Sequence, residues 1–135
     1  LSAPAAVRTV QEDPLQLDQA LDFVRQHWQT GDVVATFAPH ASLLTVGEAD
    51  FYAQESGYPF LETPTGRVDI WTGTPVLDSV ESLSDLLEDG RRVWLIVHRE
   101  NWQRHYSETY RTFVEQRMDV AFDGTGTRVY LFDPG

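Results

Sequence analysis

Cysteine and lysine are both absent from this sequence of 135 residues. The absence of cysteine excludes a disulfide framework, thiol catalysis and zinc sites built from thiolates. It does not indicate a compartment, because a chain without cysteine is stable on either side of a membrane. Long apolar runs are missing too, and no stretch approaches the roughly 20 apolar residues that cross a bilayer.

Positive charge is scarce, because ten arginines supply all of it against 21 aspartates and glutamates. The formal net charge is therefore −11 at pH 7. A surface that binds nucleic acid needs basic side chains that neutralise phosphates, and anionic lipid headgroups attract the same kind of surface. The charge balance thus argues against nucleic acid as a partner and is typical of an acidic, solubilising surface.

The apolar content is sufficient for one core, since 41% of the residues are hydrophobic and 12% are aromatic. The length is that of a single domain. We expect residues 1–12 to be a lead-in segment and residues 13–135 to form one α/β domain. No cofactor and no metal are expected.

The first helix is predicted over residues 13–31. Asp13 caps its N-terminus, Pro14 occupies the first helical position and Gly31 ends it. Its apolar face follows helical spacing and consists of Leu17, Ala20, Leu21, Val24 and Trp28. We therefore expect Trp28 to be largely buried.

Two further helices follow from the sequence. Residues 77–90 carry a helical apolar face, and Asp78 with Glu81 three residues later resembles a capping box. Another helix begins at Ser107. A short helix is also expected over residues 41–47.

Strand patterns alternate with these helices. They cover residues 32–37, 50–54, 67–71, 91–97, 118–122 and 127–132. Residues 91–97 are apolar around Trp94, which is typical of a central strand covered on both faces. Residues 56–66 are rich in proline and glycine and are expected to be irregular. The pattern predicts an α/β fold with a mainly parallel, Rossmann-like sheet flanked by helices and a C-terminal antiparallel hairpin.

Two histidines follow predicted strands at their carboxyl ends, His40 and His98. If the strands are neighbours, both imidazoles face one crevice, at the edge where open α/β sheets bind ligands. The alternative is that each histidine makes only a local hydrogen bond. His98, Glu100 and His105 match no helical zinc pair, so no metal site is expected.

The middle segment, residues 50–71, interleaves aromatic and acidic side chains. Its candidate ligand-binding residues are Asp50, Tyr52, Asp69 and Trp71. Aromatic faces beside carboxylates suit a sugar, and they equally suit a small domain that covers its sheet with large side chains. Both interpretations stay open from the sequence.

Three stretches together resemble a known family: "QLDQALDFVRQHWQTGDVVATFAP", "ADFYAQESGYPF" and "DIWTGTPVLDSVESLSDLLEDGRRVWLIV". They are similar to the C-terminal extracytoplasmic soluble domain of bacterial multi-spanning membrane glycosyltransferases, such as protein mannosyltransferases and aminoarabinose transferases. The resemblance covers about residues 14–132. In that family the catalytic acidic residues lie in the membrane portion, so the resemblance assigns no catalytic residue to this chain.

The resemblance implies a non-catalytic domain of a polyprenyl-phosphate-sugar-dependent glycosyltransferase, with a structural or acceptor-binding role. Its expected partners are the membrane portion of the parent protein and a sugar or peptide acceptor. Its expected location is the extracytoplasmic face of the cell membrane, tethered through upstream membrane helices. The alternative is a free-standing small α/β enzyme with a crevice at His40 and His98.

Overall fold

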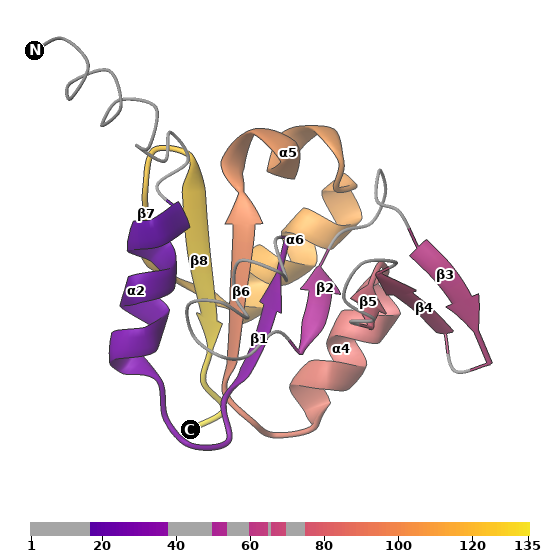
Figure 1. Cartoon of the computed structure of the whole chain (residues 1–135), viewed down its shortest axis with the longest axis horizontal. Helices are drawn as coiled ribbons and strands as arrows, with labels where there is room; N and C mark the ends of the chain where they lie inside the picture. Colours follow the sequence, from indigo (N-terminus) through magenta and orange to yellow (C-terminus); the bar gives the residue numbers. More distant parts are fainter. Residues whose placement is uncertain (1–16, 38–49, 54–59, 65, 70–74) are drawn as a thin grey trace, which may run out of the picture.

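The computed structural model describes residues 17–37, 50–53, 60–64, 66–69 and 75–135. These residues form a mixed α/β structure with a six-stranded sheet, a two-stranded sheet and flanking helices (Figure 1). The helices are α2 (Leu17–His27), α4 (Val80–Glu88), α5 (Arg99–Arg104) and α6 (Glu108–Arg117). The strands are β1 (Val33–Thr36), β2 (Phe51–Ala53), β3 (Phe60–Thr63), β4 (Gly66–Asp69), β5 (Val76–Leu77), β6 (Val93–His98), β7 (Asp119–Asp123) and β8 (Thr127–Phe132).

The six-stranded sheet is mixed and has the order β5-β2-β1-β6-β8-β7. Strands β5, β2, β1 and β6 run parallel, whereas β8 is antiparallel to β6 and β7 is antiparallel to β8. The predicted C-terminal hairpin is therefore confirmed. The parallel part accounts for three of the five strand pairings in this sheet.

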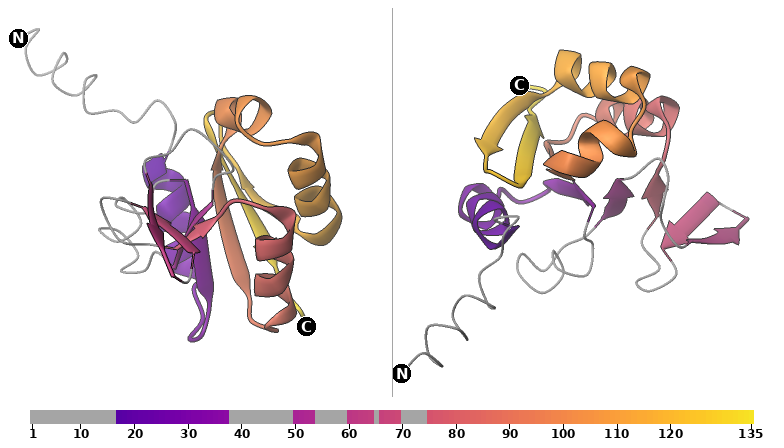
Figure 2. Two further views of the ribbon diagram at one scale, coloured as in Figure 1. Left: turned by 90° about the vertical axis from the view of Figure 1, so that its right-hand side faces the viewer. Right: turned by 90° about the horizontal axis from the view of Figure 1, so that it is seen from above.

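Strand β6 lies inside the sheet between β1 and β8, as predicted for a fully apolar strand. Because side chains alternate along a strand, Val93, Leu95 and Val97 join one core cluster, while Trp94 and Ile96 join the other. Helix α2 covers the Trp94 face, and α4, α5 and α6 cover the opposite face (Figure 2). The sheet is thus a middle layer between two cores.

The two tryptophans predicted to be buried differ in their environment. Trp94 is only 1% exposed, which confirms the prediction for β6. Trp28 has intermediate exposure and packs against the same core, so it is less completely buried than Trp94. Helix α2 ends at His27, one residue before Trp28, and Gly31 lies in the following turn with φ of 94°. The tryptophan therefore lies beyond the end of the helical face.

Helix α4 begins one residue later than the predicted capping box requires. Ser79 is the N-cap, its hydroxyl accepts from the Ser82 backbone N–H at 3.1 Å, and the Ser82 hydroxyl contacts the Ser79 backbone N–H at 3.2 Å. The Asp78–Glu81 capping box is therefore wrong by one position. Ser79 and Ser82 form the capping box instead. Glu81 lies in the first turn, where its negative charge interacts favourably with the positive end of the helix dipole.

The sequence predicts an irregular structure for residues 56–66, but the described residues of this stretch belong to a hairpin of two strands. Strands β3 and β4 pair as an antiparallel hairpin, with Leu61 opposite Val68 and Glu62 opposite Arg67. Pro64 follows β3 in the turn, where its missing N–H removes no ladder hydrogen bond. The predicted strand over residues 67–71 is confirmed as far as Asp69.

Helix α5 was not predicted, because six residues carry no readable apolar period. It follows β6 directly, and His98 is its N-cap. Helix α6 begins after Ser107, whose hydroxyl accepts from the Tyr110 N–H at 3.1 Å, as predicted. The lead-in segment, Asp13, Pro14 and the predicted helix over residues 41–47 lie outside the described residues.

Candidate functional site

The carboxyl edge of the parallel strands is where the sequence predicts a ligand crevice. Strands β1 and β6 are parallel neighbours, with Val33 opposite Val93 and Thr36 opposite Ile96. Residues that follow these strands therefore emerge at the same edge. His98 lies at this edge, while His40 lies outside the described residues, so the pairing of the two imidazoles stays a prediction.

His98 has a structural task at this edge. Its Nδ1 accepts a hydrogen bond from the backbone N–H of Asn101 at 3.2 Å, which caps α5. Its ring packs against Phe37, just beyond β1, with 5.6 Å between ring centroids. A general-base role for Nδ1 would compete with this cap for the same lone pair.

Asp50 lies at the opposite end of the strands. Its carboxylate Oδ2 accepts from the Val34 N–H at 2.9 Å, and its own N–H donates to the Val34 carbonyl at 3.0 Å. Val34 is opposite Trp94, four residues before His98. At about 3.3 Å per residue, Asp50 is roughly 13 Å along the strands from His98. The structure therefore does not bring these two candidates together.

The other candidates are divided between the two sheets. Tyr52 lies in β2 opposite Thr36 of β1, and Asp69 ends β4 opposite Phe60 of β3. Trp71 lies outside the described residues. Only the strand positions of Tyr52 and Asp69 are described, so the prediction of a shared aromatic and acidic surface stays open.

A charged cluster that the sequence did not predict lies beside His98. Arg99, the first residue of α5, donates from Nη1 to the Gly124 carbonyl at 2.9 Å and pairs with Asp123 at 3.1 Å. Arg128 of β8 donates from Nε to the same carboxylate at 3.0 Å. The hydrogen bond from Arg128 lowers the pKa of Asp123, and the charges of Arg128 and Arg99 act in the same direction against the effect of burial. The cluster fastens the start of α5 to the β7–β8 turn.

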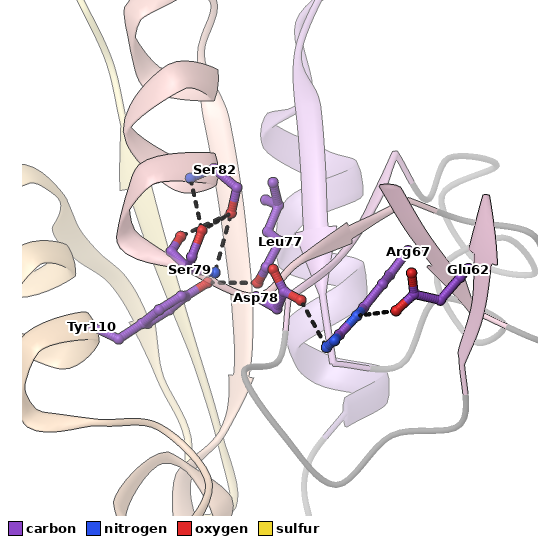
Figure 3. A network of polar contacts seen from close by, with 7 residues as sticks. All are labelled: Glu62, Arg67, Leu77, Asp78, Ser79, Ser82 and Tyr110. Carbon is purple, nitrogen blue, oxygen red and sulfur yellow. Dashed lines mark hydrogen bonds and ion pairs between the residues drawn. The ribbon is translucent and has the colours of Figure 1, made fainter. Parts of the chain in front are cut away.

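A second polar network joins the β3–β4 hairpin to the start of α4 (Figure 3). Arg67 pairs with Glu62 at 3.4 Å and with Asp78 at 3.5 Å. Nearby, the Tyr110 hydroxyl donates to the Leu77 carbonyl at 3.2 Å, which ties α6 to β5. Arg67 thus connects the middle segment to the main body of the fold.

A hollow of about 410 Å³, here called the α4 hollow, lies between β2, β5 and α4. Phe51, Val76 and Leu86 contribute apolar surface to it. Charged side chains from the hairpin, from α4 and from the segment after α4 also line it, namely Arg67, Asp85, Asp89 and Arg91. Small-ligand sites likewise combine apolar surface with polar groups that orient the ligand.

Within the described ranges, no group of three or more histidine, aspartate or glutamate side chains is arranged to hold a metal ion. In the same part of the chain, no helix has both the length and the apolar character that a membrane crossing requires.

No protein-family model, curated protein or solved structure matches the chain.

Proposed function

We propose that the chain is a non-catalytic, extracytoplasmic domain of a polyprenyl-phosphate-sugar-dependent membrane glycosyltransferase. Its role is structural or in acceptor binding, and its fold is a Rossmann-like variant in which β8 and β7 extend the parallel strands. The partner is the membrane portion of the parent protein, which supplies the catalytic carboxylates. This proposal starts from the sequence resemblance over residues 14–132.

The observation that carries an acceptor role is the α4 hollow. It combines the aromatic ring of Phe51 with charged groups of both signs, including Arg67 and Asp85. Sugars and short peptides present the matching combination of apolar faces and hydrogen-bonding groups. The hollow also adjoins the hairpin of the middle segment, whose aromatic and acidic side chains are candidates for ligand binding.

The roles of His98 and Asp50 support a non-catalytic domain. His98 caps α5, and Asp50 binds the backbone of β1. Glycosyl transfer from a lipid phosphate needs a carboxylate base at the acceptor and positive charge at the leaving phosphate. A net charge of −11 repels such a donor at long range, so we assign the chemistry to the membrane portion.

The test uses the full-length parent enzyme and measures kcat and KM for the acceptor. Asp85→Asn changes a residue of α4 that lines the hollow, and Glu88→Gln is its matched control on the same helix outside the hollow. Tyr52→Ala and Trp71→Ala probe the middle segment. Acceptor binding predicts a raised KM with kcat unchanged for the first variant and no change for the control.

Two results would count against the proposal at different levels. Unchanged acceptor KM in Asp85→Asn, Tyr52→Ala and Trp71→Ala, with folding intact, removes the acceptor role and leaves a structural one. A parent reading frame without membrane spans upstream of Leu1 contradicts the glycosyltransferase assignment altogether. It would favour the free-standing enzyme with a crevice at His40 and His98.

A further inference from the structure

The three helix N-caps that the structure describes differ in their chemistry. Ser79 caps α4 and Ser107 caps α6, each through its hydroxyl group. The cap of α5 is the imidazole of His98, whose Nδ1 accepts from the Asn101 backbone N–H at 3.2 Å. Serine does not change charge near neutral pH, whereas histidine is the side chain whose charge ordinarily changes between pH 5 and 8. Among these three helices, only α5 therefore has a cap that titrates in this range.

The α5 cap requires a neutral imidazole. Nδ1 of His98 accepts the Asn101 N–H with its lone pair, which places the hydrogen of the neutral ring on Nε2. A protonated ring carries a hydrogen on both nitrogens and has no acceptor. The side chain is partly exposed, so it exchanges protons with the solvent. Protonation of His98 and capping of α5 therefore exclude each other.

The surroundings of His98 do not offset a positive charge on its ring. Along α5 and the β7–β8 hairpin, the charged residues next to it are Arg99, Glu100, Asp123 and Arg128. Asp123 already pairs with both arginines, and Glu100 pairs with a second arginine of α5 at 3.0 Å. On the side of β1, the described contact is an uncharged phenylalanine ring, at 5.6 Å between centroids. A cation at a helix N-terminus is also unfavourable to the helix dipole.

Helix α5 holds a large aromatic side chain against the core. Trp102 is 3% exposed and packs against Tyr106, Tyr110 and Tyr130, at 4.7, 6.2 and 5.7 Å between ring centroids. The helix has only six residues, so each backbone hydrogen bond at its end matters for its stability. Figure 1 shows α5 at the end of the sheet toward which β1 and β6 run. Unwinding its first turn would loosen the cover of this carboxyl edge, where open α/β folds bind ligands.

We propose that His98 is a pH-sensitive switch that holds α5 in place at pH 8 and releases its first turn at pH 5. The neutral imidazole caps the helix, and the protonated imidazole leaves it uncapped while the rest of the fold is retained. Loss of an N-cap acceptor changes a helix equilibrium by roughly five- to tenfold. The inference goes beyond the proposed function, because it rests on the α5 cap and not on the reaction of the parent protein.

Native-state hydrogen exchange of single amides, measured by ¹H–¹⁵N NMR between pH 5 and pH 8, tests the switch. Protection factors correct for the intrinsic pH dependence of exchange. The reporter is the His105 amide, which donates to the Asn101 carbonyl at 2.8 Å in α5. The control is the Met118 amide, which donates to the Val114 carbonyl at 2.8 Å in the serine-capped α6. From pH 8 to pH 5, we expect protection to fall about tenfold at the reporter and less than about twofold at the control.

His98→Asn and His98→Ala form a matched pair at the cap. Asparagine is a preferred N-cap that does not titrate, so this variant should keep the reporter protected at both pH values. Alanine offers no acceptor, so the reporter should be poorly protected at both. His105→Gln removes the imidazole at the other end of α5 and should keep the pH dependence of the unmodified chain. Circular dichroism verifies that the variants are folded.

A tenfold fall in reporter protection in the unmodified chain, abolished in His98→Asn, supports the proposal. An unchanged reporter between pH 8 and pH 5 would overturn it, and so would a full pH dependence in His98→Asn. An equal fall at the reporter and at the α6 control would assign the effect to the whole fold and would also contradict it. If His98→Ala does not fold, the comparison of the unmodified chain with His98→Asn still gives one of these results.

Discussion

Asp32 is a buried carboxylate that links β1 to β6, and its removal should destabilise the fold. The residue is 8% exposed and precedes β1. Its Oδ2 accepts from the Trp94 indole N–H at 2.8 Å and from the Gln29 backbone N–H at 3.0 Å. The Arg92 guanidinium donates to both carboxylate oxygens, at 3.2 and 3.3 Å. Asp32 thus links the α2–β1 turn to β6.

The loss in the free energy of unfolding for Asp32→Ala depends on the partners that lose their hydrogen bonds. Trp94 is 1% exposed, so its indole N–H loses its acceptor in a place that water does not reach, at about 1–3 kcal/mol. Arg92 loses its charged partner but keeps Asp133 at 3.6 Å and partial contact with water. We therefore expect a loss of about 3 kcal/mol in the free energy of unfolding, near the lower bound for a broken buried ion pair.

Urea denaturation, followed by tryptophan fluorescence and circular dichroism, measures this loss. Asp22→Ala is the control, because Asp22 forms an exposed pair with Arg25 on the surface of α2 and should contribute under about 1 kcal/mol. Asp32→Asn keeps the side-chain volume and should fall between the two. A loss below about 1 kcal/mol for Asp32→Ala, with an unchanged m-value, would refute the reasoning.

Three further predictions concern stability. Trp94→Ala should cost about 3–5 kcal/mol in urea denaturation, and Trp28→Ala should cost less because its ring is only partly buried. Ser79→Ala should lower the free energy of unfolding by about 1 kcal/mol, and Glu81→Ala should lower it by less. Equal losses in the two variants would instead favour the capping box of Asp78 and Glu81. The pKa of Asp123 is lowered in the folded state, so its stabilising contribution is present above the unfolded pKa of about 3.9 and is lost as the pH falls through the folded value. Acid titration of stability should therefore be shallower in Asp123→Asn, and an identical pH profile would contradict this.

The sequence predicts the elements that carry long or uninterrupted patterns. The apolar run around Trp94 indicates a strand buried on both faces, and the hairpin at residues 123–126 follows from its glycines. Helix α5 has six residues, too few for a helical apolar period to be recognised. The strands on either side of Pro64 were not predicted, because proline and glycine in this stretch usually indicate irregular structure. The boundary of α4 differs because serine and aspartate are comparable N-caps, so Asp78 and Ser79 compete for the position.

The candidate site is less predictable, because it depends on which strands pair. The carboxyl-edge position of His98 follows from the sequence, but its bond to Asn101 requires the unpredicted helix. Asp50 precedes β2, and only the parallel register with β1 places its carboxylate on the Val34 backbone. The ion pairs of Asp123 with Arg99 and Arg128 need β8 beside β6, a pairing between segments about 30 residues apart that no local pattern specifies.

We propose that this domain does not carry out glycosyl transfer itself. The most direct measurement incubates the purified chain with a radiolabelled polyprenyl-phosphate sugar and sugar or peptide acceptors, and quantifies labelled product. The account predicts no product above the level without protein. Turnover that depends on the chain and is abolished by His98→Ala, with folding intact, would contradict it and establish the carboxyl edge as an active site.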